Sequence, residues 1–394
     1  MENLDDFYMI TPKDLQDIKD FIVNKDLSET IRNIEYQLKQ QELVELNIAV
    51  TGESGSGKST FVNAFRGVGD EDEGSAETGP VETTKEPAAY VHPKYETVKV
   101  WDLPGIGTPN FKADEYLKRV EFEKYDFFII IASGRFRECH TQLANEIRKM
   151  GKTFYFVRSK IDASITAEQR KKNFNLKKTL GMIREECENG LNKIDFENPD
   201  VFLISNFELG KFDWNLLQEK MEIELQEHKR RVLLLALPNI TQEINEKKKA
   251  ALAENIPKVA FLSACVATIP IPGLSVAVDL AIVQREIEVY YNTFGLDDPS
   301  LQMLCNRSGK TIDEFKSLMK SPLRDGLNPA SIMSLLSAGS LIIAENTVEY
   351  VASCIPLLGT VVAGSMSYLT VSSMLKKALD DLAEDAVNVL QATF

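Results

Sequence analysis

Cysteine and histidine, the residues that form disulfides and zinc sites, are few in this 394-residue chain. The five cysteines are odd in number and scattered, no Cys-x-x-Cys pair occurs, and only three histidines are available as ligands. A disulfide framework or a zinc site is therefore not expected, and a reducing cytosol fits this composition. The histidines form no evident triad with a serine or a cysteine, so acyl-transfer chemistry has no support.

Basic charge is also scarce, because 45 Lys and Arg stand against 59 Asp and Glu and the net charge is -14. A general nucleic-acid binder needs a basic face that displaces counterions, so this class of partner is not expected. The few basic runs are read as solvated helix faces. They are Lys171-Lys172, Lys229-Arg230-Arg231 and Lys247-Lys248-Lys249.

Long uninterrupted hydrophobic runs are missing as well. The charge-free stretches 259–278 and 350–375 are long enough to span a membrane, but Pro, Gly and hydroxyl residues interrupt them. We expect buried helices there, with peripheral membrane contact as the first alternative and hairpin insertion as the last; 331–344 has the same ambiguity. The start MENLDDFYMI has neither a signal-peptide pattern nor a Met-Gly lipidation signal, so a cytoplasmic location is expected.

Short β-branched and aromatic runs alternate with polar helical patterns from about residue 44 to residue 230. Strands are expected at 43–50, 97–103, 126–132, 152–159 and 200–205. Helices are expected from Lys58 and around 112–122, 138–150, 172–189 and 213–228. This alternation predicts an α/β domain with a mostly parallel, doubly wound sheet, and runs such as FFIII fit strands covered on both faces.

Both ends of the chain have helical patterns instead. Thr11 and Ser28 are candidate N-caps in residues 1–45, each followed by apolar residues at helical spacing. From residue 231 onward no strand pattern remains, and prolines divide the sequence into helices. We therefore divide the chain into N-terminal helices (1–45), a sheet domain (46–230) and a C-terminal helical domain (231–394).

The segment GESGSGKS follows an apolar strand and precedes a helical pattern, which is the context that a phosphate-binding P-loop requires. Backbone N–H groups of such a loop and the N-terminus of its helix surround the phosphates. Lys58 reaches the β- and γ-phosphates, and the Ser59 hydroxyl ligates Mg²⁺. The predicted nucleotide contacts in this segment are Gly52, Glu53, Ser54, Gly55, Ser56, Gly57, Lys58, Ser59 and Thr60.

A second phosphate motif, DLPG, ends the next long strand. Asp102 is placed to hold Mg²⁺ through water, and the Gly105 N–H contacts the γ-phosphate. The next position holds Ile106, where many such enzymes keep a glutamine that orients the attacking water. Hydrolysis by a single chain is therefore expected to be slow.

The segment between these motifs, residues 74–84, has the position of a first switch, which needs a threonine that closes over Mg²⁺ and the γ-phosphate. Thr78, Thr83 and Thr84 are the candidates. We place Thr78 at the metal and Thr84 at the nucleotide, although the residues alone do not select among the three.

A base-recognition motif, Ser159-Lys160-Ile161-Asp162, closes the strand at 152–159 and resembles the (N/T)KxD motif of GTPases. The Asp162 carboxylate accepts from guanine N1–H and from the 2-amino group, which adenine cannot match, and the Lys160 stem covers the base. Ser159 departs from the usual Asn or Thr, but its hydroxyl can keep a supporting hydrogen bond. Ser205-Asn206 stands where a backbone N–H meets guanine O6, so GTP is favoured over ATP.

Together these motifs resemble the immunity-related GTPases, an interferon-inducible family of cell-autonomous defence. The stretches that carry the resemblance, in chain order, are GESGSGKST, TGPVETT, WDLPGIGTPNF, YDFFIII, FYFVRSKID and FLISN. The resemblance implies a Ras-like P-loop GTPase domain at about 46–230, with the helices of both chain ends packed as one helical domain. Lys58 is typical of the lysine-bearing subgroup.

The resemblance also implies GTP and GDP binding with Mg²⁺, GTP-dependent dimers or oligomers formed through the G domain, and innate-immune action at membranes of pathogen vacuoles. Peripheral association of a cytoplasmic protein with intracellular membranes follows from it. In related proteins a first-switch glutamate lies at the dimer contact, and Glu82 is the matching position. Lys58, Thr78, Glu82 and Gly105 are the implied catalytic set.

Three functions compete at this point. An assembling GTPase is favoured, in which a second copy supplies what Ile106 lacks. A GTP-gated binding module that recruits partners without hydrolysis is the alternative. An ATP-dependent transporter or kinase is disfavoured by Asp162.

Overall fold

The computed structural model describes residues 44–79, 84–106, 112–192, 199–267, 274–328, 330–331, 334 and 359–393. The chain forms two compact units, one mainly of Leu43–Thr241 and one mainly of Gln242–Leu301 and Lys310–Thr393. The expected N-terminal helices, Glu82 and Thr83 lie outside the described residues, and so does most of 331–344. The contribution of residues 1–45 to a helical domain therefore stays a prediction.

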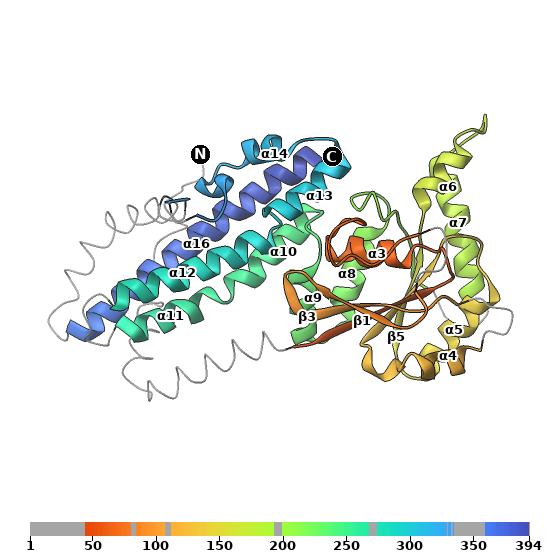
Figure 1. Cartoon of the computed structure of the whole chain (residues 1–394), viewed down its shortest axis with the longest axis horizontal. Helices are drawn as coiled ribbons and strands as arrows, with labels where there is room; N and C mark the ends of the chain where they lie inside the picture. Colours follow the sequence, from red (N-terminus) through yellow and green to blue (C-terminus); the bar gives the residue numbers. More distant parts are fainter. Residues whose placement is uncertain are drawn as a thin grey trace. The chain divides into compact units, whose positions relative to one another are not determined.

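The first unit is built on a six-stranded sheet with the order β2-β3-β1-β4-β5-β6 (Figure 1). Only the β2–β3 pair is antiparallel; the other neighbouring pairs are parallel. The expected α/β class with a mostly parallel sheet is confirmed. The strands are β1 Leu46–Gly52, β2 Ala88–His92, β3 Tyr95–Asp102, β4 Phe127–Ala132, β5 Thr153–Arg158 and β6 Val201–Leu203.

Strand register brings the predicted motifs to one edge of the sheet. Val50 lies opposite Asp102, so the loop after β1 and the DLPG segment after β3 are neighbours. Gly52 lies opposite Ile131 of β4, whose six residues are all buried. The carboxyl ends of parallel strands meet at this edge, where open α/β sheets bind their ligands.

Seven α-helices accompany the sheet in the described part of this unit (Figure 1). Apolar side chains of α4 and α5, such as Leu117, Leu143 and Ile147, pack in one cluster with Phe128 and Ile130 of β4. The helices are α3 Lys58–Arg66, α4 Ala113–Arg119, α5 Glu138–Lys149, α6 Ile161–Glu168, α7 Leu176–Leu191, α8 Trp214–Glu224 and α9 Glu227–Ala236. The predicted domain boundary at 230/231 falls inside α9.

Three elements of this unit differ from the sequence-based expectation. The edge strand β2 and the short helix α6 were not predicted, and the single helix expected at 213–228 is two helices, α8 and α9. Leu225 and Gln226 separate those two helices with extended backbone angles, at a point that has neither Gly nor Pro.

The second unit is helical, as expected, and α10, α11 and α12 lie along the long helix α16 (Figure 1). Buried polar groups join its helices: Asn245 Nδ2 donates to the Ala383 carbonyl, and Lys248 Nζ donates to the Thr293 carbonyl. The helices are α10 Gln242–Ala253, α11 Ile256–Ala267, α12 Leu274–Thr293, α14 Ile312–Leu318 and α16 Gly359–Thr393. Helix α13 Asp298–Ser308 begins in this unit, and its residues from Gln302 belong to the first unit.

The two charge-free stretches are only partly described. Residues 259–267 lie in α11, and the described part of 350–375 lies in α16. Across the described residues, no helix is both long enough and apolar enough to cross a bilayer. In the described parts, Val259, Ala260, Val371 and Leu375 are buried, which agrees with the expected buried helices.

Candidate functional site

The loop Gly52–Gly57 after β1 depends on glycine at two positions. Gly52 has φ +147, and a Cβ there would lie 2.0 Å from the Ile131 carbonyl oxygen of the neighbouring strand. Gly57 has φ +91 and forms the N-cap of α3. Since φ values in this range strain L side chains, these glycines allow the loop to curl above the N-terminus of α3.

Lys58 is held at the start of α3. Its side chain is buried, and Nζ donates to the Glu53 carbonyl at 3.0 Å. The Ser56 N–H donates to the same carbonyl at 3.2 Å. The ammonium group therefore lies inside the curl of the loop, as a P-loop lysine does.

A hydroxyl–carboxylate cluster lies next to the loop. Ser59 Oγ donates to Asp102 Oδ2 at 2.6 Å, and Thr84 Oγ1 donates to the same oxygen at 2.9 Å. Asp102 is fully buried, and its Oδ1 has no hydrogen-bond partner among the described residues. Burial raises the pKa of Asp102, whereas Ser59, Lys58 and Thr84 lower it. A buried carboxylate oxygen without a donor, beside two hydroxyls, suits a hard cation with oxygen ligands.

The predicted base-recognition residues lie across the loop from this cluster. Ser159 is buried, and its Oγ donates to the Ser56 carbonyl at 2.6 Å, so the short side chain does keep a supporting bond to the P-loop. Lys160 has left-handed backbone angles, with φ 56, and its Nζ donates to the Gly55 carbonyl at 2.9 Å. Both side chains fasten the base-side loop to the phosphate-side loop.

Asn206 adds a third tie to the P-loop. Its Nδ2 donates to the Gly57 carbonyl at 3.1 Å, while its Oδ1 is buried without a partner in the described part of the chain. Ser205 is fully buried, and its Oγ accepts from the Phe207 N–H at 3.3 Å. Asn206 thus links the loop after β6 to the P-loop through its side-chain amide, whereas Ser159 makes its bond to the P-loop through a hydroxyl.

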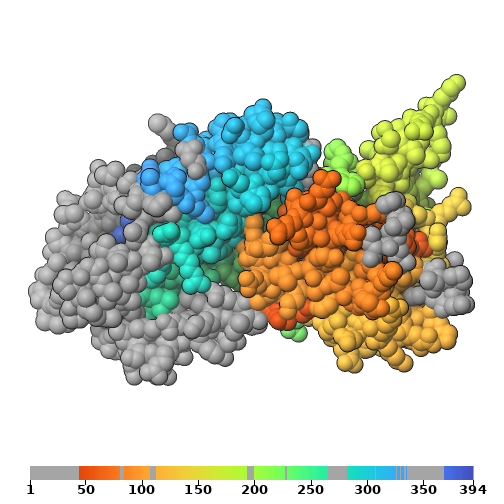
Figure 2. Space-filling model, viewed as in Figure 1, coloured from red at the N-terminus to blue at the C-terminus, as the bar shows by residue number. Residues whose placement is uncertain are grey.

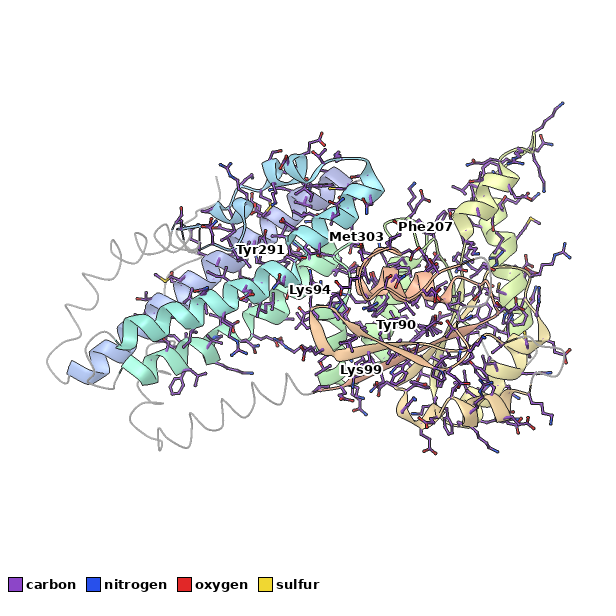
Figure 3. The ribbon with its side chains drawn as sticks, in the orientation of Figure 1. Tyr90, Lys94, Lys99, Phe207, Tyr291 and Met303 are labelled. Carbon is purple, nitrogen blue, oxygen red and sulfur yellow. The ribbon has the colours of Figure 1, made fainter. Side chains whose placement is uncertain are left out.

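These elements enclose a cavity of ≈ 320 Å³, which is within the usual size of small-ligand sites. Phe207 is on its wall and is 61% exposed; Figure 3 shows it on the loop after β6. The lining residues are Ser54, Gly55, Gly57, Lys58, Ser59, Thr60, Asp70, Thr78, Gly79, Thr84, Lys160, Asp162, Asn206 and Phe207.

The cavity brings together most of the predicted contacts and adds three residues. Asp70, Gly79 and Phe207 were missed; Phe207 could have been found as the aromatic residue directly after Ser205-Asn206. Asp102, Ser56, Ser159 and Ser205 lie buried beside the cavity and not on its wall. Gly52, Glu53 and Gly105 are not on the wall either.

Ile106 has a structural role. It is 4% exposed and belongs to the core cluster that contains Leu103 and Tyr116. Its N–H donates to the Gly52 carbonyl at 3.0 Å, which ties the DLPG segment to the P-loop strand. The side chain at the water-orienting position therefore points into the core.

The Glu53 side chain extends toward the first turn of α5. Arg137 Nε lies 3.1 Å from Glu53 Oε1, and the Cys139 thiol and the buried His140 lie near the same oxygen. Glu53, Cys139 and His140 together form a possible metal-binding cluster. However, His140 Nδ1 accepts the Arg137 N–H at 3.1 Å, so Nε2 carries the proton of the neutral ring. Burial lowers the pKa of His140 to about 4, and we interpret the group as packing behind the P-loop.

Known proteins resemble this chain over most of its length. The family model described as Interferon-inducible GTPase (IIGP) matches residues 11–393. The chain is 39% identical over 383 residues to Interferon-inducible GTPase 5 of Rattus norvegicus, covering 97% of this chain and 82% of the relative. It is 37% identical to Interferon-gamma-inducible GTPase 10 of Mus musculus, with 97% and 90% covered. A solved structure of Aquifex aeolicus Era bound to GDP.AlF4- covers 55% of this chain and 67% of its own, with 18% identity and a TM-score of 0.32.

Proposed function

The chain belongs to the interferon-inducible GTPase family, and we propose that it hydrolyses GTP to GDP and phosphate in assemblies formed through its G domain. The observation that carries this proposal is the cavity in which the P-loop, the Asp102 cluster and the Asp162 loop meet. We also propose peripheral contact with intracellular membranes and a role in innate immunity, which rest on the resemblance described above.

Phosphate binding is the task of the P-loop in this proposal. Gly55, Gly57 and the first residues of α3 line the cavity that would hold the phosphates, and a helix N-terminus favours such anions. Lys58 exchanges its bond to the Glu53 carbonyl for the β- and γ-phosphates. The positive charge then neutralises the oxygens on which charge develops during hydrolysis.

The hydroxyl–carboxylate cluster fits Mg²⁺. Ser59 and Asp102 would hold the ion, whose positive charge would offset the negative charge of the phosphates. The Thr84 bond to Asp102 favours Thr84 over Thr78 as the switch threonine, because it already reaches the same carboxylate oxygen as Ser59. Thr78 also lines the cavity, so its assignment to the metal stays a prediction.

Guanine selectivity is assigned to Asp162, with the base between two side chains. The Lys160 stem is held over the P-loop by its bond to the Gly55 carbonyl and would cover one face of the base. Phe207 lines the same cavity and offers an aromatic surface to the base. Stacking of this kind stabilises any purine, whereas the Asp162 carboxylate discriminates between them.

In our proposal, a single chain does not complete the activation of the attacking water. Because Ile106 points into the core, the DLPG segment provides no side chain at the position that usually orients the attacking water. We assign the missing contact to a second copy that meets the first switch around Glu82. Lys58 and backbone N–H groups still supply positioning and charge, so slow hydrolysis by a single chain is expected.

The nucleotide assignment is tested by binding and turnover with two variants. Lys58→Ala should abolish productive GTP binding, and Asp162→Asn should reduce the preference for GTP over ATP while the protein stays folded. Leu216→Ala, an exposed change on α8, is the control. Parent protein that binds ATP and GTP equally well would overturn the assignment. GTP binding without GDP formation at high protein concentration would favour a GTP-gated module without hydrolysis.

A further inference from the structure

A basic cluster occupies the connection between α6 and α7 and the first turn of α7, although the chain as a whole is acidic. We call it the basic tip. All five of its cations are exposed. Figure 1 shows this connection projecting beyond α6 and α7, and in Figure 2 it forms a narrow yellow-green projection. The basic tip consists of Arg170, Lys171, Lys172, Lys177 and Lys178.

The basic tip is poorly neutralised by the protein itself. Lys171 pairs with Glu168 at 2.6 Å. Among the residues that the structure describes, the other four cations of the basic tip make no ion pair. Acidic residues of α7 begin at Glu185, seven residues after Lys178 and therefore about 10 Å further along the helix. The positive potential of the basic tip is thus left to an outside partner.

Helix stability does not explain the position of these charges. Lys177 and Lys178 lie in the first turn of α7, which contains no acidic residue. The N-terminal end of a helix carries a partial positive charge, so cations there are destabilising and acids are preferred. Some helices of the chain do carry acids in that turn, such as α4 with Asp114 and Glu115, whereas α7 places two lysines there. The two lysines therefore do not stabilise the start of α7.

Two apolar side chains flank the cations. Leu176 is 46% exposed at the start of α7, and Met182 is 62% exposed. Met182 lies four residues after Lys178 and therefore on the same side of the helix. Exposed apolar side chains beside lysines are typical of protein surfaces that lie in the interface of a bilayer. An acidic protein patch would leave these apolar groups without a matching environment.

We propose that the basic tip binds the anionic surface of a phospholipid bilayer, with Met182, on the Lys178 side of α7, entering the headgroup region. This makes the peripheral membrane contact of the proposed function specific to one surface and rests on that contact. It does not depend on hydrolysis. Each Lys or Arg near such a surface contributes about fivefold to partitioning at physiological salt.

The test is co-sedimentation of the full chain with vesicles of phosphatidylcholine, with and without about one third phosphatidylserine. The parent should bind only the anionic vesicles, and binding should vanish at about 1 M salt, where the screening length is ~3 Å. K172E/K177E/K178E should weaken binding by at least about 100-fold. Met182→Ser should weaken it less, and the residual binding should keep its salt dependence.

The matched control reverses three exposed lysines in or directly before α4 and α5, K112E/K118E/K149E, which changes net charge equally and should bind vesicles like the parent. GTP binding by every variant checks its fold. Equal vesicle binding by the parent and the K172E/K177E/K178E variant would overturn the assignment of the basic tip and leave membrane contact standing. No binding of the parent to any vesicle would overturn both. Binding of a soluble acidic protein by the tip, with no vesicle binding, would point to a protein partner and contradict the proposal.

Discussion

Burial of the Asp102 carboxylate costs free energy, which the proposed Mg²⁺ ion would offset. The Asp102 carboxylate is buried away from water and lacks a full set of hydrogen-bond donors. Ser59 and Thr84 both donate to Oδ2, whereas Oδ1 has no partner among the described residues. Burial accordingly raises the pKa of Asp102 above its ordinary value of 3.8. A site that holds a charge at such cost is suited to a cation.

This cost predicts a pH dependence of stability. The folded protein binds the Asp102 proton more tightly than the unfolded chain does, so the free energy of unfolding falls as pH rises from 3.8 through the raised pKa. Asp102→Asn should remove this contribution and abolish stimulation of turnover by Mg²⁺. Denaturant unfolding of nucleotide-free protein should show the parent losing stability relative to the variant as pH rises. Parallel pH profiles would contradict the account of Asp102.

Phe207 is predicted to bind the base without selecting it. Phe207→Ala should weaken GDP binding by about 1–3 kcal/mol, the usual contribution of an aromatic stack, and ADP binding by a similar amount. Binding of inorganic tripolyphosphate, which has no base, should not change. Titration of the three ligands with parent, Phe207→Ala and the control Leu216→Ala distinguishes stacking from damage to the loop. Loss of tripolyphosphate binding would show that Phe207 supports the P-loop instead.

Single positions were predictable where a known chemical role requires a particular residue type at a fixed spacing. Lys58, Ser59 and Asp102 come together because P-loop spacing and strand register leave few alternatives. Asn206 was predicted for a backbone contact, but its side-chain bond to the Gly57 carbonyl depends on two loops 149 residues apart. The core position of Ile106 was also not predictable, because the sequence shows what the residue lacks and not where it points.

Among helices and strands, accuracy followed the strength of the local signal. The apolar run of β4 predicts a buried strand, and the structure has one. The edge strand β2 lies between Pro87 and Pro93 and is half exposed, so its pattern is weak. The break between α8 and α9 arises from the extended backbone of Leu225 and Gln226, which no turn residue announces.

The start of α14 gives a direct test of local stabilisation. Thr311 accepts from the Glu314 N–H, and the Glu314 carboxylate accepts from the Thr311 N–H, which is a complete capping box. Thr311→Ala should lower the free energy of unfolding by about 1 kcal/mol. Ser317→Ala, which also removes an exposed hydroxyl from this helix, should change it by less than about 0.5 kcal/mol. Equal losses in denaturant titrations would show that the cap contributes nothing particular.

Taken over its full length, the chain combines a nucleotide-binding unit with a helical unit, and the family match covers both. Assembly cannot be read from one chain, because its interface is formed only when two copies meet. The proposed division is that one copy binds GTP and a second completes the arrangement for hydrolysis.

Glu82→Ala should separate nucleotide binding from assembly. GTP affinity should stay within about twofold of the parent, because Glu82 is assigned to the dimer contact and not to the nucleotide. Cooperative turnover and GTP-dependent light scattering should both fall. A variant that assembles and hydrolyses like the parent would contradict the role carried over from the family.

Turnover per chain, measured against protein concentration with light scattering in the same sample, tests the central claim most directly. If Ile106 leaves water activation to a second copy, GTP hydrolysed per chain should rise with concentration and follow the GTP-dependent scattering signal. A turnover per chain that stays constant from the nanomolar range to tens of micromolar, in roughly the range where weak homodimers form, would contradict it.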